Sequence, residues 1–132
     1  RGTRLYDSPE VQAMVSAWGA FWSRHRRILT EDVLHLRRPS VSGWDAIMHV
    51  SSALQHPGDE EIALAMVFNP SPMPVSTPLK LPLYYTGVSD AVLVAEGPAG
   101  APKRMQLARD ASVVVDVALP AGGITFFVVT QA

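Results

Sequence analysis

Four histidines are the side chains of this sequence that could bind a metal ion: His25, His35, His49 and His56. Transition metals favour closely spaced ligands such as His-x-x-x-His, often together with cysteine. No two of these histidines have that spacing, and the chain contains no cysteine. We therefore expect hydrogen-bonded structural histidines, with no metal site and no cofactor.

The carboxylates do not single out an acid–base pair. Asp59, Glu60 and Glu61 are consecutive and precede an apolar segment, which predicts a solvated charged loop. A glycosidase needs two carboxyl groups about 5–10 Å apart across a cleft. The sequence leaves such a pair open among five other carboxylates: Asp45, Asp90, Glu96, Asp110 and Asp116. Neither a serine nucleophile elbow nor a P-loop motif is present.

Aromatic side chains could contact a partner at two places. Trp18, Phe21 and Trp22 recur at helical spacing, which predicts one stripe that is buried in a core or docked on another domain. A carbohydrate platform is the alternative for this stripe. A second set lies near predicted turns and supplies the candidates for carbohydrate contact: Trp44, Tyr84 and Tyr85.

A basic cluster flanks the end of the aromatic stripe. Five arginines are close in sequence, with two acidic residues beside them. A phosphate site is one interpretation. A helix C-terminus with interdomain salt bridges is the simpler one, since cations stabilise the negative end of a helix dipole. The arginines are Arg24, Arg26, Arg27, Arg37 and Arg38.

The aromatic stripe belongs to a helix predicted over residues 8–29. Apolar residues and His25 repeat at the i, i+3, i+4, i+7 spacing of one helix face. Asp7 followed by Glu10 is typical of a capping box. Gly19 inside the helix lowers its stability, which indicates close packing at that position.

The remainder of the sequence is typical of short antiparallel strands separated by Gly and Pro. Residues 62–68 are apolar on both faces, which predicts a central, covered strand. Pro82 confines its strand to a sheet edge or a bulge. The pattern predicts an antiparallel β-sandwich of about eight strands, preceded by one long amphipathic helix. The expected strands are 33–37, 45–52, 62–68, 75–85, 91–96, 103–108, 113–119 and 124–130.

The length and composition of the chain argue against two classes of partner, nucleic acids and membranes. A chain of 132 residues predicts one domain, and its net charge of −1 argues against a nucleic-acid-binding module. The apolar runs are shorter than the roughly 20 residues of a membrane span, so no membrane partner is expected. The absence of cysteine is compatible with the cytoplasm, the periplasm or export. It leaves the location open, with an exported or periplasmic parent protein as one alternative.

Six runs in a distinctive order resemble a known arrangement. The sequence is similar to the C-terminal end of large bacterial glycoside-hydrolase-like proteins, in which a (β/α)8 catalytic barrel ends in a helix that is followed by an antiparallel β-sandwich. The resemblance covers essentially the whole chain. Its runs are Phe21–Leu29, Asp32–Pro39, Asp45–Val50, Ala65–Pro70, Leu79–Gly87 and Gly122–Val129.

This resemblance implies which part of a larger enzyme each segment of the chain forms. Residues 1–30 would be the last barrel helix or a connector, and residues 31–132 the terminal sandwich. The catalytic carboxylates would lie on an upstream barrel of the same polypeptide, so no catalytic residue is assigned to this chain. The start at Arg1 is read in the same way, as part of a longer polypeptide.

The expected function follows from that assignment of segments. The chain would be a non-catalytic module of a glycosidase that stabilises the barrel and shapes the carbohydrate cleft, with Trp18, Phe21 and Trp22 docking on the barrel. The main alternative is a free-standing carbohydrate-binding module. A small independent enzyme and an adhesion or assembly domain are two further alternatives.

Overall fold

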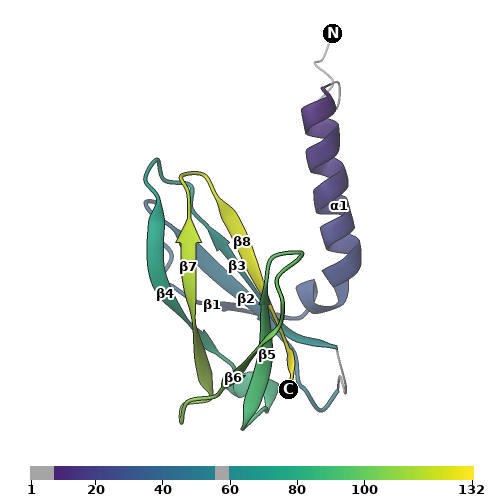
Figure 1. The fold of residues 1–132 in the computed structure, drawn as a ribbon, viewed down its shortest axis with the longest axis vertical. Helices are drawn as coiled ribbons and strands as arrows, with labels where there is room; N and C mark the ends of the chain where they lie inside the picture. Colours follow the sequence, from purple (N-terminus) through teal and green to yellow (C-terminus); the bar gives the residue numbers. More distant parts are fainter. Residues whose placement is uncertain (1–7, 56–59) are drawn as a thin grey trace.

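The computed structural model describes residues 8–55 and 60–132. Figure 1 shows a β-sandwich and one long helix, α1 (Pro9–Leu29), which meets the sandwich at its C-terminal end and extends past it toward the N-terminus. All the strand pairs described are antiparallel. The predicted fold class, a mainly β sandwich of eight strands preceded by a helix, is confirmed.

The strands form two sheets of unequal size. The larger sheet has six strands in the order β1-β2-β3-β8-β5-β6, and the smaller pairs β4 with β7. The larger sheet therefore extends beyond the smaller one. The bounds are β1 Asp32–His35, β2 Asp45–Val50, β3 Glu61–Phe68, β4 Val75–Pro82, β5 Ala91–Glu96, β6 Lys103–Gln106, β7 Ser112–Leu119 and β8 Ile124–Gln131.

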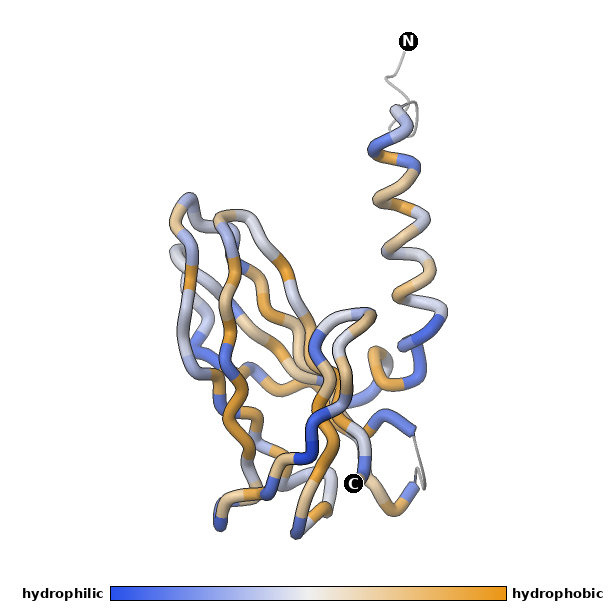
Figure 2. Tube along the Cα trace, in the orientation of Figure 1, coloured by the Kyte–Doolittle hydropathy of each residue, from blue (hydrophilic) through white to orange (hydrophobic). Residues whose placement is uncertain are grey.

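The core lies between the facing surfaces of the two sheets. Strand β7 alternates buried valines and leucine with exposed residues, as a strand covered on one face must. Strand β3 runs between β2 and β8, and all its residues are buried or half-buried. Figure 2 shows hydrophobic residues, in orange, in the strands of both sheets. The predicted central strand is thus confirmed. The side chains at the centre of the core include Met48, Ala65, Leu81, Val94, Val117 and Phe127.

The strands predicted over 33–37, 45–52, 75–85 and 103–108 all end earlier than expected, and the difference is largest for 75–85. The expectation of strand 75–85 is wrong beyond Pro82, because the chain turns into a 3-10 helix, η1 (Tyr84–Thr86). The Thr86 hydroxyl donates to the Leu83 carbonyl at 2.6 Å, and Gly87 follows with a φ of 77° that favours glycine. As predicted for a strand containing Pro82, β4 is an edge strand.

The start of α1 also differs in detail. Ser8 is the N-cap, and its hydroxyl accepts from the backbone N–H of Val11 at 3.1 Å. The predicted capping box therefore does not set the start, and its Asp7 lies outside the described residues. Pro9 at the first helical position is compatible with this cap, because the first helical N–H groups have no partner within the helix.

Candidate functional site

A compact joint fixes the C-terminal end of α1 to the outer face of the large sheet. His25 is 4% exposed, and its Nδ1 lies 2.6 Å from Oε1 of Glu61 at the start of β3. Arg27 donates from Nη2 to the backbone carbonyl of the same Glu61. Ile28 is fully buried although it lies outside the core between the sheets. Two polar side chains and one apolar side chain therefore anchor this end of the helix.

An aromatic cluster continues the joint toward the N-terminus of the helix. The ring of Phe21 lies 4.9 Å from that of Phe126 on β8, at an interplanar angle of 64°. The same Phe21 ring lies 4.8 Å from His25 and 5.4 Å from Trp18. Edge-to-face pairs of this kind add to the free energy of apolar burial. Phe21 thus packs on the sandwich of its own chain, whereas docking of the stripe on another domain stays a prediction.

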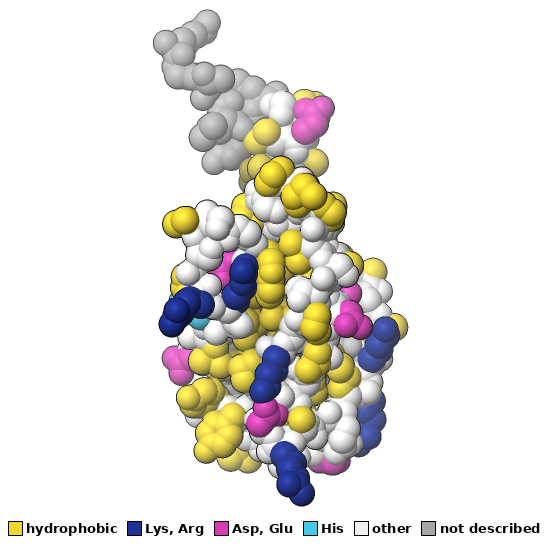
Figure 3. Space-filling model, turned by 90° about the vertical axis from the view of Figure 1, so that its left-hand side faces the viewer, with side chains coloured by type: hydrophobic (Ala, Val, Ile, Leu, Met, Phe, Trp, Pro, Cys, Tyr) yellow, Lys and Arg dark blue, Asp and Glu magenta, His cyan; other side chains and the backbone are white. Residues whose placement is uncertain are grey.

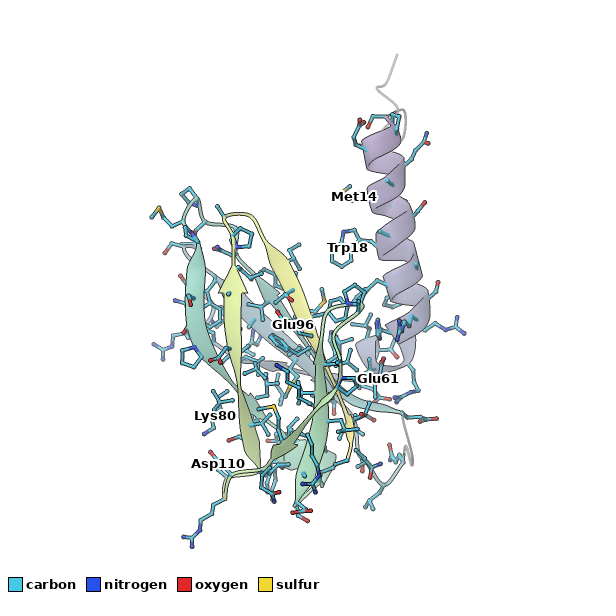
Figure 4. The ribbon with its side chains drawn as sticks, in the orientation of Figure 1. Met14, Trp18, Glu61, Lys80, Glu96 and Asp110 are labelled. Atoms are coloured by element: carbon cyan, nitrogen blue, oxygen red, sulfur yellow. The ribbon has the colours of Figure 1, made fainter. Side chains whose placement is uncertain are left out.

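The other aromatic residues of the stripe remain uncovered within this chain. Trp18 is 41% exposed and Trp22 is 50% exposed, and Met14 and Val15 are similarly accessible. Figure 4 shows Met14 and Trp18 projecting from α1 on the side that faces the sandwich. Figure 1 shows that α1 diverges from the large sheet toward its N-terminus, in line with the exposure of these side chains.

The neighbouring sheet face is apolar as well. On β3 and β8 the register pairs Met66 with Phe126 and Phe68 with Ile124, all on the face directed away from the sheet-to-sheet core. Ile124 is 47% exposed and the others are half-buried. We refer to the combined area as the helix–sheet surface. It comprises Met14, Val15, Trp18 and Trp22 of α1 and Ile47, Met66, Phe68, Ile124 and Phe126 of the sheet.

Gly19 adds to this surface without packing inside the chain. A Cβ atom built on Gly19 would have no heavy atom within 4 Å among the residues described, apart from its own helix backbone. The close packing predicted at Gly19 is therefore wrong for the chain by itself. The glycine leaves a shallow gap in the helix flank next to Val15 and Trp22.

Two of the histidines lie beside hydrogen-bond partners in the structure. His25 is hydrogen-bonded to Glu61, and Nδ1 of His49 lies 3.4 Å from the Glu31 carbonyl. His35 is exposed, and His56 lies outside the described residues. Within residues 8–55 and 60–132, no three His, Asp or Glu side chains are grouped as metal ligands.

The charged run before β3 is only partly solvated. Glu60 is exposed, and its Oε2 lies 3.8 Å from Nε of Arg27. Glu61 is half-buried beneath the helix, so the prediction of a solvated loop is wrong for this residue. Asp59 lies outside the described residues. The basic cluster likewise divides, because Arg27 anchors the helix whereas Arg37 stacks over Trp44.

The candidate carbohydrate residues lie at opposite ends of the sandwich. Trp44 precedes β2, beside the end of β3 at Phe68, and the guanidinium of Arg37 lies 4.7 Å above its ring. Tyr84 and Tyr85 follow the far end of β4 and are 73% and 66% exposed. The structure thus does not join the three rings into one platform.

Tyr85 lines a polar cleft of its own. The cleft has a volume of about 540 Å³ and is lined by carboxylate, hydroxyl and amide groups near the start of β1 and the end of β2. Such groups can pair with the hydroxyls of a sugar while an aromatic ring stacks on its face. The polar residues are Glu31, Asp32, Ser51, Ser52 and Gln55.

The sequence did not reveal two residues that build the joint, Glu61 and Phe126. Glu61 is 36 positions from His25, so no local spacing connects them. A signal for Phe126 exists in retrospect: β8 is apolar on both faces, which indicates that something covers its outer face. That covering element is the end of α1.

Charge and hydropathy add two observations. On the face that Figure 3 shows, basic and acidic side chains are interspersed among hydrophobic ones and form no extended patch of one sign. The described part of the chain contains no helix with the length and hydropathy of a membrane span.

In comparisons with known proteins, no family model matches the chain and no curated protein sequence is similar to it.

Proposed function

We propose that this chain is a non-catalytic β-sandwich module of a glycoside-hydrolase-like protein, which docks through its helix–sheet surface on the catalytic barrel of the same polypeptide. The observation that carries the proposal is the exposed apolar stripe of α1, continuous with the apolar outer face of the large sheet. Single exposed apolar side chains are ordinary, but a contiguous patch marks a contact site.

The shape of the surface favours a globular partner. Met14 and Trp18 on the helix and Ile124 on β8 line two surfaces that diverge from the joint. A rounded domain can contact both surfaces at once, whereas a single peptide strand would cover one of them. Isolated helices in water are marginal without tertiary packing, so the first turns of α1 gain most from such a partner.

The position of the helix agrees with the barrel as occupant. The uncovered apolar residues of α1 run from Met14 to Trp22, and Phe21 among them packs on the sandwich. A domain preceding the helix would therefore meet the stripe first. In this arrangement the module supports the barrel and borders its carbohydrate cleft, and the catalytic carboxylates lie on the barrel.

The mass of the native gene product is the first test. An antibody raised against this chain should detect a polypeptide several times heavier than 14.3 kDa. A native product near 14.3 kDa would contradict the proposal. The isolated chain should also show no turnover of chromogenic glycosides.

Iodide quenching of tryptophan then tests the surface itself. The chain has three tryptophans, so Trp44→Phe leaves Trp18 and Trp22 as the reporters. In the isolated Trp44→Phe chain we expect emission typical of exposed indole, with strong quenching. In the full-length protein carrying the same substitution, quenching should fall several-fold; equal quenching in both would show that the barrel does not cover the stripe.

Carbohydrate binding is a second candidate function, favoured by the polar cleft around Tyr85. Affinity electrophoresis against a panel of polysaccharides tests it, with Tyr85→Ala as the variant and Tyr84→Ala as the matched control. Tyr84 is similarly exposed but does not line this cleft. Retardation that is lost in Tyr85→Ala and kept in Tyr84→Ala would support this function, and equal mobility on every glycan would exclude it.

A further inference from the structure

The two strands of the small sheet leave two outer edges with different properties. In the register of β4 and β7, Pro78 lies opposite Asp116 and Pro82 opposite Ser112. Paired residues in an antiparallel ladder alternate between bonded and non-bonded positions. The backbone N–H of Leu83, one position after Pro82, donates to the Ala111 carbonyl at 2.8 Å. The residues of β4 that form hydrogen bonds with β7 therefore alternate with those that do not. Pro78 and Pro82 are at positions of the second kind, where no N–H donor to β7 is needed.

The backbone N–H and C=O groups of the β7 residues at these non-bonded positions must point away from β4. The residues are Ser112 and Asp116, opposite the two prolines, and Val114 and Ala118, which share the alternation. The Ser112 carbonyl shows this direction, because it accepts from the N–H of Ala108 at 2.9 Å, outside the β4–β7 pair. Beyond Ser112, β7 has no ladder partner other than β4 among the residues described. The edge from Val114 to Ala118 is therefore open.

The edges at β4 and β6 carry features that prevent strand addition. On the outer edge of β4, Pro78 and Pro82 provide no N–H donors. On β6, Lys103 and Arg104 add positive charge directly after Pro102. Edge strands are commonly protected by prolines and lysines of this kind. The sequence of β7 from Val113 to Leu119 has neither.

A cleft runs beside the open edge. It has a volume of about 560 Å³ and lies between β7 and the β5–β6 hairpin, which forms one edge of the large sheet (Figure 1). Its apolar lining includes Val94, Met105, Val115 and Phe127. Its charged lining residues are two carboxylates and one lysine: Glu96, Asp116 and Lys103.

We propose that the open edge of β7 binds an extended, basic peptide segment of a partner protein, which adds to the small sheet as a third strand. The N–H and C=O groups of Val114, Asp116 and Ala118 form the ladder with it. Strand addition of this type obtains affinity from main-chain bonds and specificity from alternate side chains. This site is distinct from the helix–sheet surface and does not depend on the barrel.

The side-chain pattern of the peptide follows from the alternation of β7. Asp116 points outward, so the residue opposite it lies on the same outer face and is Lys or Arg. The neighbouring peptide residues point inward, toward Met105 and Phe127, and are apolar. An alternation of basic and apolar residues over about five positions matches both sides of the added strand.

Hydrogen exchange measured by NMR tests the edge directly. The probe is the hexapeptide acetyl-Lys-Val-Lys-Val-Lys-Val-amide, with a Glu-for-Lys hexapeptide as the control. In the free chain, the amides of Val114, Asp116 and Ala118 should exchange quickly, and those of Val113, Val115 and Val117 slowly. Saturating Lys peptide should slow the first three at least tenfold, and the Glu peptide should leave them unchanged. Absence of binding, or binding without this protection, would overturn the proposal.

Two variants separate the ladder from the charge. Asp116→Pro removes the central outward N–H, opposite the existing Pro78, and should weaken peptide binding at least tenfold. Asp116→Lys keeps that N–H but reverses the charge. It should weaken binding of the Lys peptide at least threefold and allow the Glu peptide to bind. Unchanged affinity in folded Asp116→Pro would contradict the ladder. Protection of the same amides without peptide, accompanied by a doubled mass in light scattering, would assign the edge to a second copy of the chain and overturn the proposal.

Discussion

Asn69 is the residue that ties two loops at one end of the sandwich. Its side chain is 1% exposed, and Nδ2 donates to the carbonyls of Met73 at 2.8 Å and Pro120 at 3.0 Å. Its Oδ1 accepts from the backbone and hydroxyl of Ser71. The amide is thus fully satisfied, which buried polar groups require.

Substitution of Asn69 should be among the most destabilising changes in a loop. Asn69→Ala removes one donor from each of the Met73 and Pro120 carbonyls, which keep the Ser71 hydroxyl and the Gly123 N–H as donors. It also removes the acceptor of the Ser71 N–H and hydroxyl, and each hydrogen bond lost costs about 1 kcal/mol. We expect a loss of about 2–3 kcal/mol in the free energy of unfolding, measured with urea. Ser71→Ala serves as the control, with a loss of about 1 kcal/mol because Ser71 is nearer the surface. Equal losses in the two variants would contradict this account.

Asp110 makes a pH-dependent contribution. The hydrogen bonds from Lys80 and Ser112 lower the pKa of this carboxyl below its ordinary value, against a small opposing effect of burial. A lowered pKa in the folded state stabilises the fold above the unfolded pKa, and this contribution is lost as the pH falls through the folded value. Asp110→Asn should therefore lower Tm at neutral pH and lose that difference in acid. A difference in Tm that is constant from pH 7 to acid would contradict this assignment.

At the scale of the element, α1 offers a matched pair of aromatic residues. Phe21→Ala removes the ring that packs on Phe126 and should lower the free energy of unfolding by about 2–3 kcal/mol. Trp22→Ala, one position later and half exposed, should change it by less than about 0.5 kcal/mol in the isolated chain. Urea unfolding followed by circular dichroism measures both. A larger loss of stability in Trp22→Ala than in Phe21→Ala would show that Trp22, and not Phe21, packs on the sheet.

Gly19 distinguishes the isolated chain from a docked one. In the isolated chain Gly19→Ala has room for its methyl group and should stabilise α1 by about 1 kcal/mol, the difference in helix propensity. In the proposed full-length protein, the same methyl would enter the contact between the helix–sheet surface and the barrel, beside Trp22. There the gain should shrink or reverse, as compared by thermal unfolding of the two proteins. The same gain in both would show that no partner approaches this flank.

At the scale of the whole molecule, protection against hydrogen exchange should be uneven. Strands β3 and β8 lie at the centre of the large sheet, whereas residues 10–20 of α1 are exposed apart from the half-buried Val11. Locally unsupported segments open with a free energy near zero, and core strands open only on global unfolding. We expect exchange by mass spectrometry to be faster by at least a hundredfold in residues 10–20. Uniform protection would contradict this division.

The sequence predicted the elements better than their contacts. Strand β5 was predicted with its observed bounds and β8 to within one residue, because alternation and Gly/Pro turns are local signals. Pro82 correctly indicated an edge strand. The His25–Glu61 pair and the Phe21–Phe126 pair were beyond reach, since each joins segments far apart in the chain. Tyr84 and Tyr85 were misplaced on a strand because the alternation continues into η1.

Because α1 is attached to the sandwich at one end only, a small rotation at that attachment moves its other end by a large distance. The joint at His25 and Ile28 is the pivot, and Pro9 lies about 24 Å along the helix axis from it at 1.5 Å per residue. A rotation of 10° at the pivot would displace that end by about 4 Å, a shift approaching one helical turn. The torsional stiffness of one histidine–glutamate contact and one pair of phenylalanines thus sets the orientation of the entire arm. A substitution at Glu61 would be felt most strongly at the far end of the helix, well away from the residue that was changed.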